Sequence, residues 1–170
     1  MKKLIAALLA LCLLFSAALA EELLWEDYKE EVAGEGKTEK VKIPDVITFK
    51  FWLPKTMKST DAKKVKADVV PAAAYKAKKG DSTLTITVLE VNSLEEYVSG
   101  LETAGAEFFT NLKINGVDCV SCENAERNEE ILIMPVEDKK VLVFTFAPLD
   151  SDDEDWDEAK DYIIASIRAV

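Results

Sequence analysis

The chain has 170 residues, with 21 Lys and Arg against 32 Asp and Glu, a formal net charge of −11, and no histidine. Because binding to phosphate backbones or anionic membranes depends on clustered Lys and Arg, this composition argues against a nucleic-acid partner. The missing imidazole excludes Ser-His-Asp and Cys-His hydrolases, HExxH zinc peptidases and imidazole-ligated iron or copper sites.

The first 20 residues have the pattern of a bacterial signal peptide. Two lysines precede an unbroken apolar run from Leu4 to Phe15, and Ala18-Leu19-Ala20 places small residues where a signal peptidase reads them. A retained transmembrane anchor needs roughly 20 apolar residues, more than this run supplies. We predict cleavage after Ala20, a secreted or otherwise extracytoplasmic product, and no membrane insertion after cleavage.

The mature chain is predicted to begin with an acidic helix or linker at residues 21–42, followed by one domain at 43–170. Leu24, Tyr28 and Val32 repeat every four residues, which indicates a short helix ended by Gly34. Residues 46–53 then alternate as a half-buried strand. Trp52 falls on the face opposite the apolar one, so it either packs beneath a helix or marks an exposed recognition surface.

The segment 55–79 is rich in lysine. It carries eight Lys and two Asp, and its pattern predicts a loop with one helical turn and then a strand near residues 72–78. Clustered positive charge favours docking of an acidic partner or a cell-wall polyanion, whereas the alternative is a solvated loop. The residues of this possible binding surface are Trp52, Lys55, Lys58, Lys63, Lys64 and Lys66.

The second half of the chain predicts hairpins and two helices. Turns at Lys79-Gly80-Asp81, Asn115-Gly116 and residues 137–140 each separate two strand patterns. Ser93 and Glu96 form a capping box before an amphipathic helix that Gly105 ends. The strands at 131–136 and 141–147 are apolar at nearly every position, which indicates that helices cover both sheet faces. A final helix places Trp156 and Ile163 on one apolar stripe.

Cys119 and Cys122 are the only cysteines after the leader, and they lie in a predicted strand. Residues three apart in an extended strand are separated by about 10 Å, beyond the reach of a disulfide. Three interpretations remain open: two reduced cysteines, a local disulfide at a bulge, or a redox pair. Asp118 and Glu123 flank the pair and disfavour the thiolate that redox chemistry needs.

An acidic run at the start of the final helix offers weak calcium candidates, namely Asp150, Asp152 and Glu154. Calcium takes six to eight oxygen ligands, but an EF-hand loop beginning at Asp150 would have Asp155 where glycine is needed. A solvated helix start that complements the helix dipole is the alternative. We expect no cofactor and assign no other metal site.

The order of these elements resembles small exported bacterial domains of the PsbP-like family. The matching segments are Leu94-Glu95-Glu96-Tyr97, Ile114-Asn115-Gly116-Val117 and Phe144-Thr145-Phe146. The resemblance implies an α+β fold with an antiparallel sheet of six to seven strands sandwiched by helices. It also implies a scaffold used for binding and assembly, although fold alone does not transfer activity.

These observations lead to one principal functional hypothesis and two alternatives. The first is an exported, non-enzymatic binding or assembly protein that recognises a protein or cell-envelope component through a sheet edge or the basic segment. The second is a thiol-disulfide protein acting through Cys119 and Cys122. The third is a calcium-binding module at the acidic helix start.

Overall fold

The computed structural model describes residues 20–65, 67–137, 139–149 and 154–170, and they form an α+β domain. The predicted signal peptide lies outside these residues, apart from Ala20. The strands are β1 (Glu21–Leu23), β2 (Gly36–Ile43), β3 (Ile47–Pro54), β4 (Met57–Ser59), β5 (Ala73–Ala77), β6 (Thr83–Glu90), β7 (Glu107–Ile114), β8 (Val117–Asn124), β9 (Glu129–Glu137), β10 (Lys140–Ala147) and β11 (Arg168–Ala169). The helices are α2 (Trp25–Tyr28), the 3-10 turn η1 (Ala62–Lys64), α3 (Leu94–Thr103) and α4 (Glu154–Ser166).

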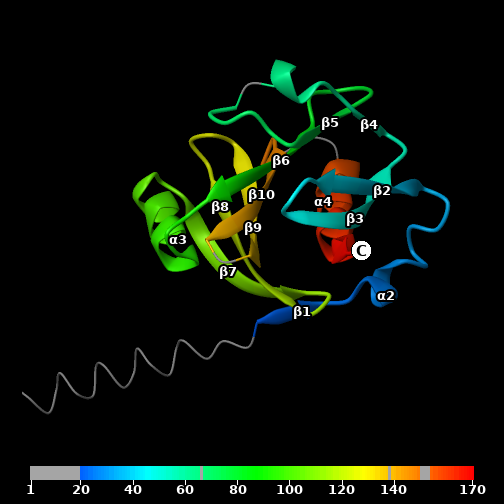
Figure 1. Ribbon diagram of the computed structural model, residues 1–170. Coiled ribbons are helices and arrows are strands. Elements are labelled where there is room, and N and C mark those ends of the chain that lie inside the picture. Colours follow the sequence, from blue (N-terminus) through cyan, green and yellow to red (C-terminus); the bar gives the residue numbers. More distant parts are fainter. Residues whose placement is uncertain (1–19, 66, 138, 150–153) are drawn as a thin grey trace, which may run out of the picture.

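Eight strands form the large sheet in the order β1-β7-β8-β9-β10-β6-β5-β4 (Figure 1). All its pairs are antiparallel except β1 with β7, so the sheet is mixed. This corrects the expectation of an antiparallel sheet of six to seven strands. The outermost strands β1 and β4 have three residues each, too few for an alternating pattern to be recognised in the sequence.

A second, three-stranded sheet has the order β11-β3-β2. β2 was not predicted, because Val41 is its only buried residue and its outer positions are charged. Residues 21–42, predicted as an acidic helix or linker, contain the single-turn helix α2 together with β1 and most of β2.

The predicted hairpins and the capped helix α3 are confirmed. Asn115 and Gly116 have φ of 47° and 86°, the paired positive values of a two-residue hairpin turn. The Ser93 hydroxyl accepts a hydrogen bond from the Glu96 backbone N–H at 3.1 Å, and Gly105 follows the helix with φ of 87°.

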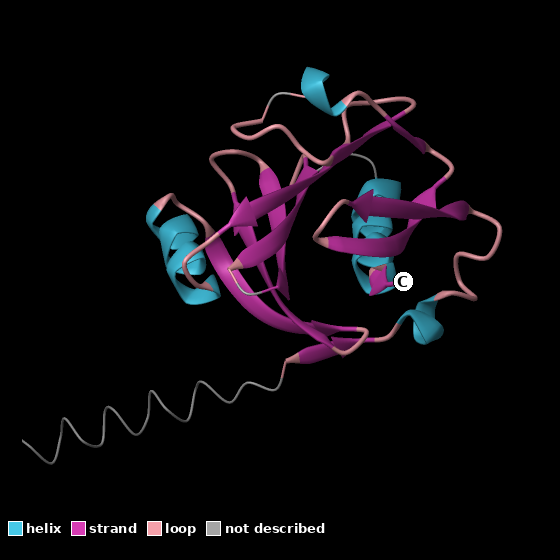
Figure 2. Ribbon diagram, in the orientation of Figure 1, coloured by secondary structure: helices cyan, strands magenta, loops and turns pink. Residues whose placement is uncertain are grey.

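Apolar side chains fill a layer on each face of the large sheet. Figures 1 and 2 show α3 and α4 on opposite sides of this sheet. On one face, α3 covers a cluster that includes Ile133 and Val143. On the other, α4 and the small sheet cover Leu142 and Phe144, so the covering of this face is not helical alone. The continuous apolarity of β9 and β10 follows from this burial on both sides.

Asn115 joins three distant segments at the β7–β8 turn. Its Oδ1 accepts a hydrogen bond from the Trp25 N–H at 2.9 Å, and its Nδ2 donates to the carbonyl oxygens of Ala165 and Ile167, each at 2.8 Å. One turn residue thereby fixes the start of α2 and the end of α4 against the large sheet.

Trp52 is 7% exposed and lies beneath α4. Its backbone N–H donates to the Ser166 hydroxyl at 2.7 Å, and its indole meets the Tyr162 ring edge to face. A Cβ on Gly36 would approach the indole Nε1 to 2.2 Å, so this close packing requires glycine there. Trp52 is thus a packing residue and does not contribute to an exposed surface.

Candidate functional site

The lysine-rich segment contains more structure than the predicted loop. β4 pairs with β5 in the register Met57↔Ala77, and η1 lies between these strands. Lys55, Lys58, Lys63 and Lys64 are all exposed. Lys66 lies outside the described residues.

Lys55 of the predicted surface lines a pocket with a volume of about 410 Å³. We name it the basic pocket. It lies between the turn after β3, the turn after β5 and the start of α4. Its lining residues are Lys55, Thr56, Met57, Ala77, Lys78, Lys79, Ser82, Asp155, Trp156 and Ala159.

The wall of the basic pocket is apolar and fixed by packing. Met57, Trp156 and Ala159 are each less than a tenth exposed. The Trp156 indole donates its Nε1–H to the Pro148 carbonyl at 2.9 Å and packs on Phe146. Because its only polar atom is satisfied, Trp156 presents an apolar ring surface in a single orientation.

The rim of the basic pocket is positively charged. Lys55, Lys78 and Lys79 are exposed, and Asp155 is the single carboxylate among the described lining residues. The turns place these lysines: Gly80 has φ of 85° and closes the β5–β6 hairpin, and Lys78 N–H donates to the Thr56 carbonyl at 2.7 Å. The arrangement suits an anionic group held over an apolar wall.

Lys78 and Lys79 belong to the lysine-rich segment, and Lys79 to a predicted turn, but neither was predicted to be part of the binding surface. Trp156 was predicted as a core residue, which it is. The sequence carried no signal that these residues meet, because β4, β5 and α4 are brought together only by the tertiary fold.

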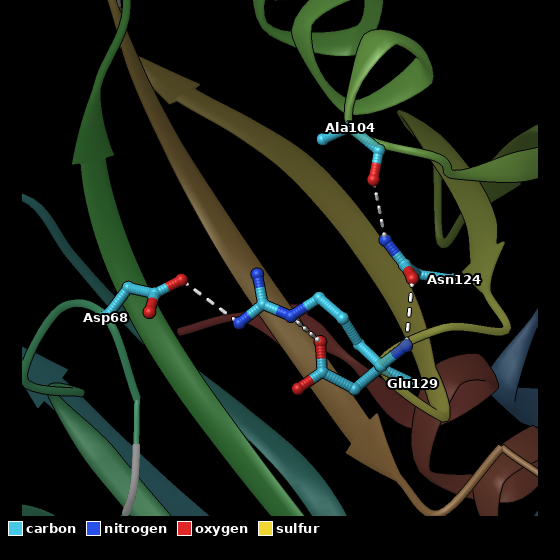
Figure 3. A network of polar contacts seen from close by, with 5 residues as sticks. Asp68, Ala104, Asn124 and Glu129 are labelled. Atoms are coloured by element: carbon cyan, nitrogen blue, oxygen red, sulfur yellow. Dashed lines mark hydrogen bonds and ion pairs between the residues drawn. The ribbon is translucent and has the colours of Figure 1, made fainter.

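An ion-pair network attaches the far part of the lysine-rich segment to the sheet (Figure 3). The Arg127 guanidinium lies 3.0 Å from Asp68 and 3.2 Å from Glu129. The Arg127 N–H donates to the Asn124 side chain, which in turn donates to the Ala104 carbonyl at the end of α3. Because the Arg127 side chain is half exposed, this network positions the loop and does not form a buried reactive centre.

Cys119 and Cys122 are free and buried, on opposite faces of β8. Cys119 belongs to the layer beneath α4, and Cys122 to the layer beneath α3. Burial raises the pKa of Cys119 to about 12 and that of Cys122 to about 11. Each thiol stays protonated at neutral pH, and the fold keeps the two sulfurs in different layers, which is the reverse of what a redox pair needs.

The calcium candidates Asp150 and Asp152 lie outside the described residues, as does the side chain of Glu154. Within the part of the chain that the structure describes, no cluster of three or more His, Cys, Asp or Glu is arranged to hold a metal ion.

A larger hollow of about 880 Å³ lies between α3 and the β9–β10 hairpin. Its rim is of mixed sign, with Glu90 and Glu96 beside Lys139 and Lys140. At a rim of mixed sign, the carboxylates repel an anion that the ammonium groups attract, and the reverse holds for a cation. We therefore favour the smaller basic pocket as the candidate binding site.

The described helices include none with the length and apolarity to cross a membrane. No protein-family model matches the sequence, and no curated protein matches it either.

Proposed function

We propose that the protein is an exported, non-enzymatic binding protein whose basic pocket takes an anionic ligand with an apolar part, such as an acidic cell-envelope component. The observation that carries this proposal is the placement of Lys55, Lys78 and Lys79 around the apolar wall formed by Met57 and Trp156. Export is supported by the leader sequence, and a non-enzymatic role by the composition without histidine. We further propose a PsbP-like architecture, on the resemblance in element order.

The two parts of the pocket have separate roles in recognition. Burying the apolar part of a ligand against Met57 and Trp156 gains about 25 cal/mol per Å² of apolar surface removed from water. The exposed lysines add attraction that salt screens, so they select the sign of the ligand's charge more than they raise affinity. A neutral or cationic ligand with the same apolar part should bind more weakly.

The experiment compares octanoate with octylamine, which have the same chain and opposite charge. Binding is measured by calorimetry and by shifts of the Trp156 indole signal in NMR spectra. We expect octanoate to bind at least about tenfold more tightly. Equal binding of the two probes, or no shift at Trp156, would contradict the proposal.

A matched pair of variants separates the pocket from general surface charge. Lys55→Glu with Lys78→Glu should weaken octanoate binding by about tenfold or more. Lys63→Glu with Lys64→Glu makes the same change in net charge at η1, outside the pocket, and should leave binding unchanged. Equal weakening by both double variants would show that only the overall charge matters.

A further inference from the structure

The outer edge of β7 is only partly covered. β1 pairs with Leu112, Lys113 and Ile114, so among the described residues the stretch from Glu107 to Asn111 has a strand on one side only, namely β8. An open edge offers unpaired N–H and C=O groups, and proteins commonly protect such edges with lysine, proline or a β-bulge. This stretch contains no lysine or proline, and its bulge leaves Phe108 exposed beside the edge.

A β-bulge in the open stretch turns an aromatic ring toward solvent. The register shifts between Glu107↔Glu123 and Thr110↔Ser121, so Phe108 and Phe109 both lie opposite Cys122. Phe109 packs into the layer beneath α3, whereas Phe108 is 72% exposed. Phe108 also has φ of 55°, a conformation that costs a bulky residue energy and that persists most often where function needs it.

The charge beside this edge is negative. Glu107 lies directly opposite Glu123 on β8, and Glu123 lies opposite Glu130 on β9. Lys160 pairs with Glu130, but among the described residues Glu107 and Glu123 have no ion-pair partner. Like charges directly across two strands destabilise the pair, so a cation brought between them would be favoured.

We propose that the open edge of β7 binds an extended, basic segment of a partner protein by strand addition. The main chain of Glu107 to Asn111 supplies the hydrogen bonds, as in other β-augmented complexes. An apolar residue of the partner packs on Phe108, and its Lys or Arg side chains lie beside Glu107 and Glu123. This surface is distinct from the basic pocket. It carries glutamates where the pocket carries lysines, and it binds through main-chain hydrogen bonds where the pocket binds through side chains.

The test uses labelled peptides with the full chain. A short peptide of alternating Lys and Val is compared with its Glu-Val counterpart and with a Lys-Val peptide N-methylated on alternate residues, which cannot complete a ladder. Binding is measured by fluorescence anisotropy, and the location by amide hydrogen exchange at residues 107–111. We expect the Lys-Val peptide to bind at least about tenfold more tightly than either control and to slow exchange at this edge.

Variants of the edge give the second arm. Phe108→Gly accommodates the backbone and removes the ring, and should weaken peptide binding by about tenfold or more. Glu107→Gln with Glu123→Gln should weaken it by a similar factor and reduce its salt dependence. Glu95→Gln with Glu102→Gln removes the same charge from α3 and should change nothing.

Three results would overturn the proposal. The first is equal binding of the N-methylated peptide, because the main-chain ladder would then be unnecessary. The second is equal binding of the acidic peptide. The third is a dimer, detected by sedimentation of the protein alone, that Phe108→Gly dissociates, because the occupant of the edge would then be a second copy of this chain.

Discussion

The two ends of the large sheet finish in opposite ways. At one end, the three-residue strand β4 lies beside β5, and α4 adds an apolar wall behind three lysines. At the other end, the three-residue strand β1 pairs only with Leu112 to Ile114. Among the described residues, this leaves the outer edge of β7 open beside two glutamates that have no ion-pair partner. If both proposals above hold, the first end binds its ligand through side chains in a recess, and the second binds its partner through the main chain. One sheet would then serve two partners of opposite charge.

The largest expected effect is on the free energy of unfolding, and it compares a buried aromatic residue at one end of the sheet with an exposed one at the other. Trp156→Ala should lower the free energy of unfolding by about 3–5 kcal/mol, because it removes a buried indole from the main apolar layer. Phe108→Ala should change it by less than about 0.5 kcal/mol, because the ring is exposed. Urea unfolding measures both. Similar losses would show that Phe108 is a packing residue and would remove the contrast.

The next effect tests the ion pairs by which Lys160 joins α4 to β9. Lys160 Nζ lies 3.3 Å from Glu130 and 3.2 Å from Asp157, and its side chain is only 8% exposed. Lys160→Met should cost about 3 kcal/mol at pH 7, because it leaves Glu130 charged and buried without its partner. At pH 5 the cost should be smaller, because Glu130 can protonate.

Lys40→Met is the control for this change, because Lys40 is exposed on β2. It should cost less than about 0.5 kcal/mol at either pH. A loss in Lys160→Met that does not vary with pH would mean that packing of the lysine side chain, and not its charge, holds α4 in place.

A smaller effect of opposite sign is expected at Phe108. Phe108→Gly should raise the free energy of unfolding by up to about 1 kcal/mol, because glycine adopts the positive φ of the bulge without steric cost. Phe108→Ala retains that cost and serves as the control. Thermal unfolding of the two variants distinguishes them. If Phe108→Gly is less stable than Phe108→Ala, the φ of 55° carries no strain.

The smallest effect is the dependence of stability on pH. Burial raises the pKa of Glu129, of Glu130 and of Asp161 above their ordinary values. For Glu130, Lys160 opposes this rise, while Asp161 and Glu123 add to it. Because these groups bind protons more readily in the folded state, stability should rise as pH falls through the raised pKa values toward the ordinary ones.

The measurement is the melting temperature between pH 7 and pH 5. Glu130→Gln should reduce the change in melting temperature between these two pH values, whereas Glu95→Gln on the exposed surface of α3 should not. A melting temperature that falls steadily from pH 7 to pH 5 would contradict this account.

Local sequence signals predicted the parts of the fold that local chemistry decides. Asn115-Gly116 predicted its hairpin because both residues accept positive φ, and Ser93 predicted the start of α3 because its hydroxyl caps an N–H. β1, β2 and β4 were missed because they are short or expose one charged side. The partner of β1 is β7, about 90 residues further along the chain, which a local pattern does not reveal.

The candidate sites were predictable in charge but not in position. The lysine count indicated a basic surface, yet of the five proposed residues that the structure describes, Lys55 alone lines the basic pocket. Trp52 could not be placed from its strand alone, because its burial depends on Gly36 and Tyr162. The exposure of Phe108 was equally hidden, since the bulge that produces it interrupts an otherwise regular strand pattern.

Because Cys119 and Cys122 lie three residues apart in β8, their thiols can report local opening of the protein on the two faces of the large sheet. Each thiol is buried in a different layer, so it becomes reactive toward an alkylating reagent only when that layer opens. The labelling rate at Cys122 would follow undocking of α3, and the rate at Cys119 would follow separation of α4 and the small sheet. Resolving the two adducts by mass would give two opening free energies from one unmodified chain.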